Sequence, residues 1–426
     1  PGSRTGRPGA ALCLLVFAGP GLRTSLLGSL LVAEAAIGEA VGIPDEGLAI
    51  LVESVVFGSL LATLLLPALA RALGTLRLSL FASLVVVALL AASFRIAPGL
   101  SPDPGNAWLL FAAAAVLGFA SAVLSPVTQG MLVRVSDADP AARGLLQTVW
   151  SAGQPGGFIV GSLAGGVAME LWGWPGAFAV PLGFAVLTAL PLLFARPLGL
   201  DVGGREAGDR GGGDLLVLLV AVVAFQVWST LGARASWVSP WVLACFAVTV
   251  ASAAAAVVRL LRSPQPALPL DPYRVAGFAA AALVLLLLQL PTTAEFEVLL
   301  LTDLAGTTPE ALGDRAALGN VGQLAGTALA GVLLLRRRYR LALVGGLAIT
   351  VAGLAAYTAY PWASGLVFIT VTRIVVGVGS GLATPVLFVA ALNRMPARLA
   401  VPAGTWLVLI LIGGTEVGLA VLDIVL

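Results

Sequence analysis

Several ionisable residues lie inside long apolar runs, and these are the residues of the sequence best suited to chemistry. They are Arg23, Glu34, Glu53, Glu295, Glu297, Arg373, Glu416 and Asp423. A charged side chain at the centre of a bilayer costs about 2.5–3.5 kcal/mol or more unless it is paired or hydrated. We therefore expect these residues to take part in substrate binding or ion coupling.

The expected ion pairing centres on Arg373. We predict that it pairs with one or more of Glu295, Glu416 and Asp423 in the outer half of the membrane. The alternative for Glu34, Glu53 and Asp423 is a place at the water interface, where a charge needs no partner.

Uncharged polar residues inside other apolar runs predict a polar lining for a path through the protein. These residues are Gln129, Gln154, Gln289, Asn320 and Gln323. The alternative is that they hydrogen-bond neighbouring helices, as isolated polar residues in membrane spans often do.

The composition argues against an enzyme, a metal site and a bound cofactor. The chain has no His, which is the commonest metal ligand and general base, and all of its 23 basic residues are Arg. Cys13 and Cys245 are far apart in sequence and lie in apolar runs, as buried structural cysteines do. The glycines of "VGVGSGLATP" follow no strand, so they do not indicate a nucleotide site, and nothing indicates binding of nucleic acid.

The elements that must position these residues are membrane-spanning helices. The chain has 426 residues, of which 59% are hydrophobic and 10% charged, and its mean hydropathy is +1.04. Its apolar runs are near the 20 residues that a helix needs to cross a bilayer, which predicts an all-α polytopic membrane protein. The predicted spans are 10–36, 48–70, 76–96, 107–134, 143–170, 175–195, 214–233, 240–262, 274–304, 310–335, 341–360, 362–392 and 400–426.

The arginines orient these spans. This layout places 18 arginines on one side, 3 on the other and 2 inside spans, which together make the 23. Arginine accumulates in cytoplasmic loops, so we expect a multi-pass protein of the cell (inner) membrane with its N-terminus in the cytoplasm. The last span then ends outside. Because the chain also begins without Met, we expect that both ends are trimmed and that a final helix is missing.

The longest hydrophilic stretch divides the chain. Residues 196–213 are rich in Gly and in charges of both signs, which is typical of a flexible linker. We expect a first six-helix bundle over 1–195, two inserted spans over 214–262, and a second bundle of five visible helices over 263–426.

A glycine ridge marks the fifth span. Gly153, Gly157, Gly161 and Gly165 recur every four residues, so they lie along one face of a helix, and Gly166 follows them. Helices in lipid attract one another mainly through close contact, which small residues permit.

This stretch resembles the fifth-span signature of antiporters in the major facilitator superfamily, with Ser162 where that family has proline. "LWGWPGAFAVPLGF" is similar to the start of the sixth span in the drug:proton antiporters. The run ending in "PLDPYR" resembles the inserted spans of the fourteen-spanner branch, and "IPDEGL" and "EFEVLLL" are loosely similar to actinobacterial lipid exporters.

The resemblance implies a fold of two helical bundles that rock against each other around a central cavity. It also implies that the ridge packs on the counterpart of this span in the other bundle and gates the cavity. The alternative is that the ridge serves packing alone.

Other positions depart from the family pattern. In the segment Pro67–Leu78, Gly74 matches the superfamily's cytoplasmic loop and Arg77 lies just past the expected basic pair, but Arg71 replaces the aspartate. The fourth span lacks the usual arginine, so proton antiport does not follow from the resemblance. The equivalent loop of the second bundle, "RRRYR", is expected either to bind anionic lipid head groups or only to fix topology.

We therefore expect a monomeric secondary transporter that exports apolar or amphipathic molecules, such as drugs or lipids. Its expected partners are membrane lipids and a lipophilic substrate, with protons as a candidate coupling ion. The alternative is a non-transporting membrane scaffold or partner subunit that keeps the fold.

Overall fold

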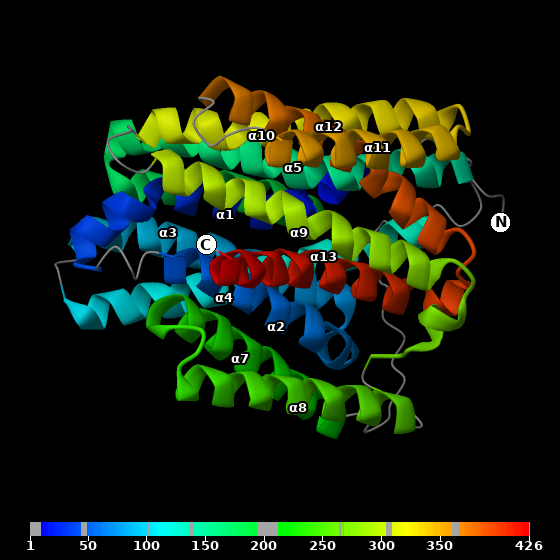
Figure 1. Ribbon diagram of the computed structural model, residues 1–426, viewed down its shortest axis with the longest axis horizontal. Coiled ribbons are helices and arrows are strands. Elements are labelled where there is room, and N and C mark those ends of the chain that lie inside the picture. The colour runs from blue at the N-terminus through cyan, green and yellow to red at the C-terminus, as the bar shows by residue number, and fades with distance from the viewer. Residues whose placement is uncertain are drawn as a thin grey trace.

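The computed structural model describes residues 10–43, 49–99, 103–135, 140–193, 212–263, 266, 268–303, 309–359 and 366–425. This part of the chain is built from long helices that run in nearly the same direction or its reverse (Figure 1). The α-helices are α1 (Ala10–Val41), α2 (Ala49–Leu73), α3 (Thr75–Ile96), α4 (Pro104–Val135), α5 (Pro140–Trp172), α6 (Ala179–Leu193), α7 (Gly212–Ala235), α8 (Pro240–Arg262), α9 (Phe278–Asp303), α10 (Pro309–Leu335), α11 (Tyr339–Ala359), α12 (Leu366–Leu392) and α13 (Ala397–Val425). Each predicted span corresponds to one of them.

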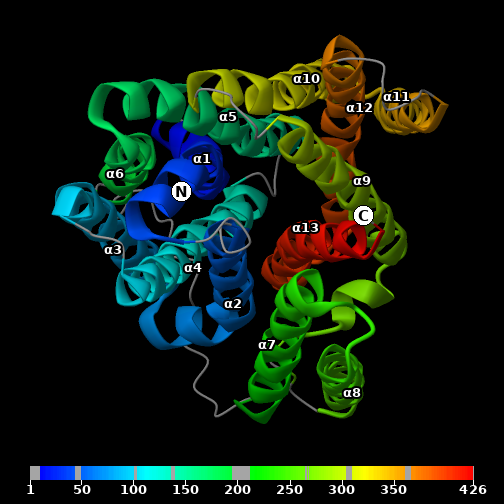
Figure 2. The same ribbon diagram turned by 60° about the vertical axis from the view of Figure 1, so that its left-hand side comes forward.

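Most of these helices suit a membrane by length and composition. Within the described residues, 10 helices are long and apolar enough to cross a bilayer, while α9 and α13 contribute shorter apolar stretches. α5 is not among these helices, because Gln, Ser and many glycines lower its hydropathy. It lies between α1 and α10, so its polar groups are shielded from lipid (Figure 2).

The first bundle, α1 to α6, is held together by backbone contacts at glycine. A β-carbon placed on Gly157 or Gly161 would overlap the carbonyl oxygen of Gly21 or Ser25 in α1. α2 and α4 pair in the same way, since Gly58 and Gly118 each face the backbone of the other helix. Such short separations let dispersion attraction act over many backbone atoms.

The second bundle, α9 to α13, repeats this construction. Gly322 and Gly326 of α10 meet backbone carbonyls of α12, and Gly377 and Gly381 of α12 meet those of α10. α1 packs on α5 and α2 on α4 in the first bundle, while α9 packs on α13 and α10 on α12 in the second. The two bundles therefore share one order of packing.

The inserted pair, α7 and α8, lies outside both bundles, alongside α2 and α13 (Figures 1 and 2). A short 3-10 helix, η5 (Asp271–Arg274), leads from this pair into α9. Trp406 of α13 donates its indole N–H to the carbonyl of Pro269 at 2.9 Å, and its ring packs edge-to-face on Tyr273. Burial of this phenol raises the pKa of Tyr273 to about 12.

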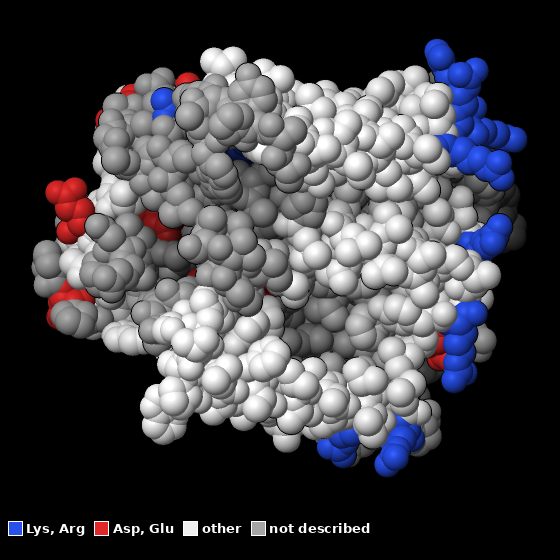
Figure 3. All heavy atoms as spheres, viewed as in Figure 1, with Lys and Arg blue, Asp and Glu red and all other residues white. Residues whose placement is uncertain are grey.

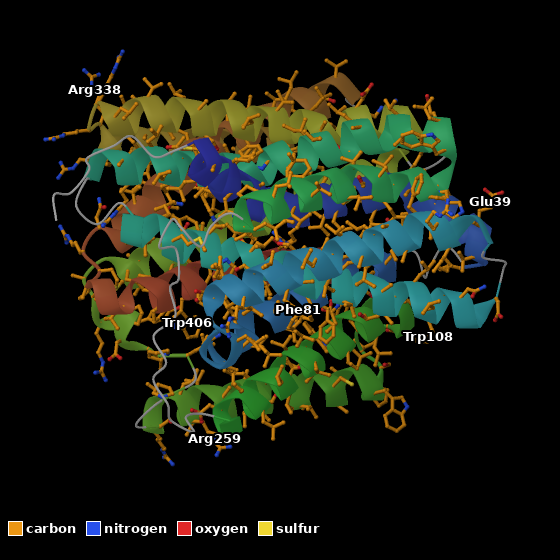
Figure 4. The ribbon with its side chains drawn as sticks, turned by 180° about the vertical axis from the view of Figure 1, so that it is seen from behind. Glu39, Phe81, Trp108, Arg259, Arg338 and Trp406 are labelled. Carbon is orange, nitrogen blue, oxygen red and sulfur yellow. The ribbon has the colours of Figure 1, made fainter. Side chains whose placement is uncertain are left out.

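Exposed arginines gather at one end of the molecule, which we call the basic end (Figure 3). The exposed arginines at this end are Arg77, Arg259, Arg262, Arg274, Arg336, Arg337, Arg338, Arg340 and Arg394, while Arg143 is buried. Among the described side chains, Arg95 and Arg315 lie toward the opposite end, where Glu39 also lies (Figure 4).

Replacing a glycine by alanine is expected to have opposite effects at two positions. Gly157→Ala should lower the thermal unfolding midpoint in detergent, because the new methyl group collides with the backbone of α1. Gly183→Ala in α6 should leave the midpoint unchanged or raise it, because nothing lies within 4 Å of the new atom and alanine favours a helix by about 0.8–1.0 kcal/mol. Equal midpoints for the two variants would contradict the close packing of α1 on α5.

Candidate functional site

Two buried charges from different bundles interact inside the molecule. Arg23 lies near the middle of α1 and is 6% exposed, and Glu416 lies in α13 and is 2% exposed. The Glu416 carboxylate is close enough to act electrostatically on the Arg23 guanidinium. Attraction between opposite charges is strong where water is excluded, so the two charges favour contact between the first bundle and the second.

Arg373 occupies a separate buried position in α12. Its side chain is packed against Gly319 of α10, and its Nη1 donates a hydrogen bond of 2.9 Å to the backbone carbonyl of Arg315. Arg373 thus joins two helices of the second bundle. Of its predicted partners, Glu416 interacts with Arg23, while the side chains of Glu295 and Asp423 lie outside the described residues, as does that of Glu297.

The structure places the two remaining predicted carboxylates away from this pair. Glu53 accepts a hydrogen bond of 2.9 Å from the Thr230 hydroxyl of α7. Glu53 thus contacts the inserted pair through α7. Glu34 lies half-buried in the last third of α1.

Gln129 is the predicted polar residue that lies deepest in the interior. Its side-chain amide, in α4, donates a hydrogen bond of 2.8 Å to Gln147 in α5, and both side chains are almost completely buried. Gly404 of α13 packs directly on Gln129. This polar contact therefore lies where the two bundles meet, near the basic end.

The other predicted polar residues have local roles or lie at helix contacts. Gln154 is half-buried in α5, and the amide of Asn320 donates to the carbonyl of Ala316 in its own helix at 3.5 Å. The backbone of Gln323 packs on Gly377 and Gly381 of α12. These residues resemble helix–helix contacts more than ligands of a common site, as the alternative interpretation allows.

Gln289 also lies at a contact between two helices of the second bundle. A β-carbon on Gly414 of α13 would lie 2.8 Å from Cβ of Gln289 in α9. Gln289 is half-buried there, and Gly414 comes shortly before Glu416 in the same helix.

An aromatic contact closes the same region of the bundle interface. Trp150 of α5 and Phe388 of α12 are both completely buried, and their ring centroids are 5.0 Å apart. The indole N–H of Trp150 is held by the Thr128 hydroxyl at 3.2 Å and the Ser125 carbonyl at 3.3 Å. We call Gln129, Gln147, Trp150, Phe388 and Gly404 the basic-end contact.

The glycine ridge has a different partner from the one expected. Gly153, Gly157, Gly161 and Gly165 all face α1, which belongs to the same bundle, and Ser29 of α1 donates a hydrogen bond of 2.8 Å to the Gly161 carbonyl. Gly166 is buried beside the ridge. The ridge therefore serves packing within the first bundle.

A separate flank of α5 contacts α10 of the second bundle. A β-carbon on Gly313 of α10 would lie 2.5 Å from the Ser162 carbonyl oxygen, so the two backbones approach closely there. Ser162 is the position where the superfamily's signature has proline. Contact between the bundles along α5 thus depends on this flank and not on the ridge glycines.

The segment Pro67–Leu78 is almost entirely helical instead of a loop. α2 continues to Leu73 and α3 begins at Thr75, so Gly74 alone joins them, with a φ of 78° that glycine adopts without strain. Arg71 therefore belongs to α2, and its side chain lies outside the described residues, whereas Arg77 is exposed in α3.

Sequence patterns could not have identified the aromatic part of the basic-end contact. Trp150 and Phe388 are far apart in the chain, and an aromatic residue in an apolar span gives no sign of its partner. Arg23 and Glu416 were detectable as charges in spans, but their proximity depends on how the bundles pack. Among the described residues, no group of three or more His, Cys, Asp or Glu side chains is placed to hold a metal ion.

A family model and individual relatives both match this chain. The sequence model of the Major Facilitator Superfamily matches residues 13–415. The chain is 31% identical over 196 residues to the multidrug efflux pump LfrA of Mycolicibacterium smegmatis, a match that covers 45% of this chain and 37% of that protein. It is 28% identical over 320 residues to the puromycin resistance protein pur8 of Streptomyces alboniger, covering 71% of this chain and 59% of that protein.

The chain thus spans less than two thirds of these relatives. In fold it is similar to the human organic anion transporter MFSD10, with a TM-score of 0.60 at 15% identity over 98% of this chain and 94% of that one.

The Arg23–Glu416 interaction predicts coupled effects of mutation. Glu416→Gln should destabilise the protein by about 3–5 kcal/mol, because it leaves the Arg23 guanidinium buried without its countercharge. Arg23→Gln should act similarly, and the double variant should lose much less than the sum of the two. Thermal unfolding of the four proteins in one detergent measures this, and strictly additive losses would show that the two residues act independently.

Proposed function

Because the chain belongs to the Major Facilitator Superfamily, whose members are membrane transporters, we propose that it is a secondary transporter that exports apolar or amphipathic small molecules by alternating access. The observation that carries this proposal is the basic-end contact. It brings α4 and α5 of the first bundle against α12 and α13 of the second through a few side chains and one glycine. Contacts of this size can separate when two bundles rock.

The proposed orientation puts the basic end in the cytoplasm. The cluster of arginines at this end supports it, since arginine is retained on the cytoplasmic side of the cell membrane. In this orientation the N-terminal end of α1 is cytoplasmic, and the basic-end contact closes the cytoplasmic half of the bundle interface.

The proposed substrates are lipophilic, either drugs or lipids. The main buried hydrophobic cluster includes residues of both bundles and consists mostly of Leu, Val and Ala. Such a lining favours molecules that leave water readily. The names of the relatives, an efflux pump and a puromycin resistance protein, support drugs and the outward direction.

The inserted helices support assignment to the fourteen-spanner branch. α7 and α8 form an additional hairpin between the bundles, and the "PLDPYR" segment connects it to α9. The division into bundles at 1–195 and 263–426 is part of this proposal. Both bundles of one chain form the site, so the transporter is proposed to act as a monomer.

Glu416 supports protons as the candidate coupling ion. Protonation would remove the negative charge of Glu416 and with it the attraction to Arg23, so that a proton could weaken a link between the bundles. The motif positions that the superfamily's antiporters use for protons give no such support, since the fourth span has no arginine.

A membrane scaffold without transport is the second candidate. The departures at Arg71 and in the fourth span favour it, because a protein that does not transport need not keep those residues. The cost of keeping Arg23, Arg373 and Glu416 buried opposes it, since a scaffold gains nothing from charges in its interior.

Reconstituted vesicles separate the two functions. We expect the purified protein to move a lipophilic dye, and a pH gradient to change the rate if protons are coupled. Glu416→Gln should abolish the dependence on the gradient. No flux of any of a panel of lipophilic dyes and fluorescent lipids, together with capture of a stable membrane partner, would favour the scaffold.

A disulfide across the basic-end contact tests alternating access. A β-carbon on Gly404 would lie 3.7 Å from Cβ of Gln129, which is within the range of a disulfide. With Cys13 and Cys245 replaced by Ser, the pair Gln129→Cys and Gly404→Cys should crosslink on oxidation and stop dye flux. A reductant should restore it.

The matched control is a crosslink within one bundle. A β-carbon on Gly165 of α5 would lie 3.3 Å from Cβ of Ser29 of α1, so Gly165→Cys with Ser29→Cys should also crosslink. This bond joins two helices of the same bundle and should leave flux largely intact. Undiminished flux through the fully oxidised Gln129–Gly404 pair would contradict movement at this contact.

A further inference from the structure

The turn between α10 and α11 concentrates positive charge. Arg336, Arg337, Arg338 and Arg340 lie within five consecutive residues, and all four side chains are exposed at the basic end (Figure 4 labels Arg338). No ion pair joins them to a carboxylate in the part of the chain that the structure describes. Like charges at such short separation repel one another, so this turn attracts an anion.

The backbone of this turn is held in a conformation that arginine disfavours. Arg338 N–H bonds the Leu333 carbonyl at 2.8 Å and Arg337 N–H bonds that of Leu334 at 2.9 Å, which is the Schellman pattern that ends a helix. Arg337 has a φ of 58°, in the left-handed region where such motifs usually place glycine. The chain therefore keeps a charged side chain where glycine would fit without strain.

Apolar side chains continue directly from the charged turn along the outside of both helices. Leu335 of α10 and Leu341 and Val344 of α11 are more than half exposed. These side chains face the lipid acyl region if the helices cross a membrane. A surface with guanidinium groups at the membrane boundary and an apolar stripe below them matches a molecule with an anionic head and acyl chains.

We propose that the turn Arg336–Arg340, with the apolar stripe beneath it, is a binding site for an anionic phospholipid of the cytoplasmic leaflet. The phosphodiester accepts hydrogen bonds from the guanidinium groups, and the N-terminus of α11 adds its partial positive charge. The site lies on the second bundle and includes none of the residues of the basic-end contact. The leaflet depends on the proposed orientation, but the binding itself does not depend on transport.

The test measures thermal unfolding of the full chain in detergent with added lipid. Phosphatidylglycerol should raise the unfolding midpoint, because a ligand that binds only the folded state stabilises it. Phosphatidylcholine and inorganic phosphate at the same concentration should raise it much less. If phosphate alone reproduces the full shift, the site is an anion site and not a lipid site.

Two variants separate lipid binding from folding. Arg337→Gly relieves the left-handed strain, so it should raise the unfolding midpoint in the absence of lipid. It should also weaken phosphatidylglycerol binding about fivefold, as expected for the loss of one basic residue near an anionic surface. The combined variant Arg336→Gln, Arg338→Gln and Arg340→Gln should lose nearly all of the lipid effect.

The matched control is Arg274→Gln. Arg274 is also exposed at the basic end, but it lies 3.5 Å from the Asp271 carboxylate, which already balances its charge. This variant should keep the whole shift with phosphatidylglycerol. The proposal is overturned if Arg274→Gln loses as much of the shift as the combined variant, or if Arg337→Gly keeps full lipid affinity.

Discussion

Contact between helix backbones at glycine is the interaction on which the rest of this structure depends. A bilayer offers no hydrophobic force between helices, because lipid is as apolar as their side chains. Glycine lets α1 approach α5, and α10 approach α12, until a single β-carbon would not fit between them. Under the proposed alternating access, each bundle moves as a rigid unit and the surfaces between the bundles separate.

Those surfaces differ in chemistry along the membrane. Toward the basic end they are closed by amide and aromatic side chains, Gln129, Gln147, Trp150 and Phe388. Nearer the middle they carry the charges of Arg23 and Glu416. Neutral contacts separate at modest cost, whereas separating buried charges requires water, a ligand or a proton to replace the lost partner. The ionic part of the interface is therefore the part that a bound molecule can control.

The sequence was enough to predict the helices and their order, because apolar runs of this length have only one stable form in a bilayer. The buried charges were also visible, since any Arg or Glu in such a run is unusual. Their partners were not predictable. Glu53 has the same sequence signature as Glu416, yet it faces α7 on the outside while Glu416 faces the other bundle. Which face of a helix meets which neighbour depends on packing between distant segments.

The glycine ridge shows the same limit, because its spacing predicted a close contact but could not identify α1 as the partner.

The inserted pair makes the two flanks of the molecule unequal. α7 and α8 lie over the line where α2 of the first bundle meets α13 of the second, while the corresponding line between α5 and α10 has no such cover among the described helices (Figure 2). A hydrocarbon-soluble compound diffusing within the membrane therefore meets two different walls. At the junction of α2 and α13 such a compound must pass around a helical hairpin before it reaches the interior.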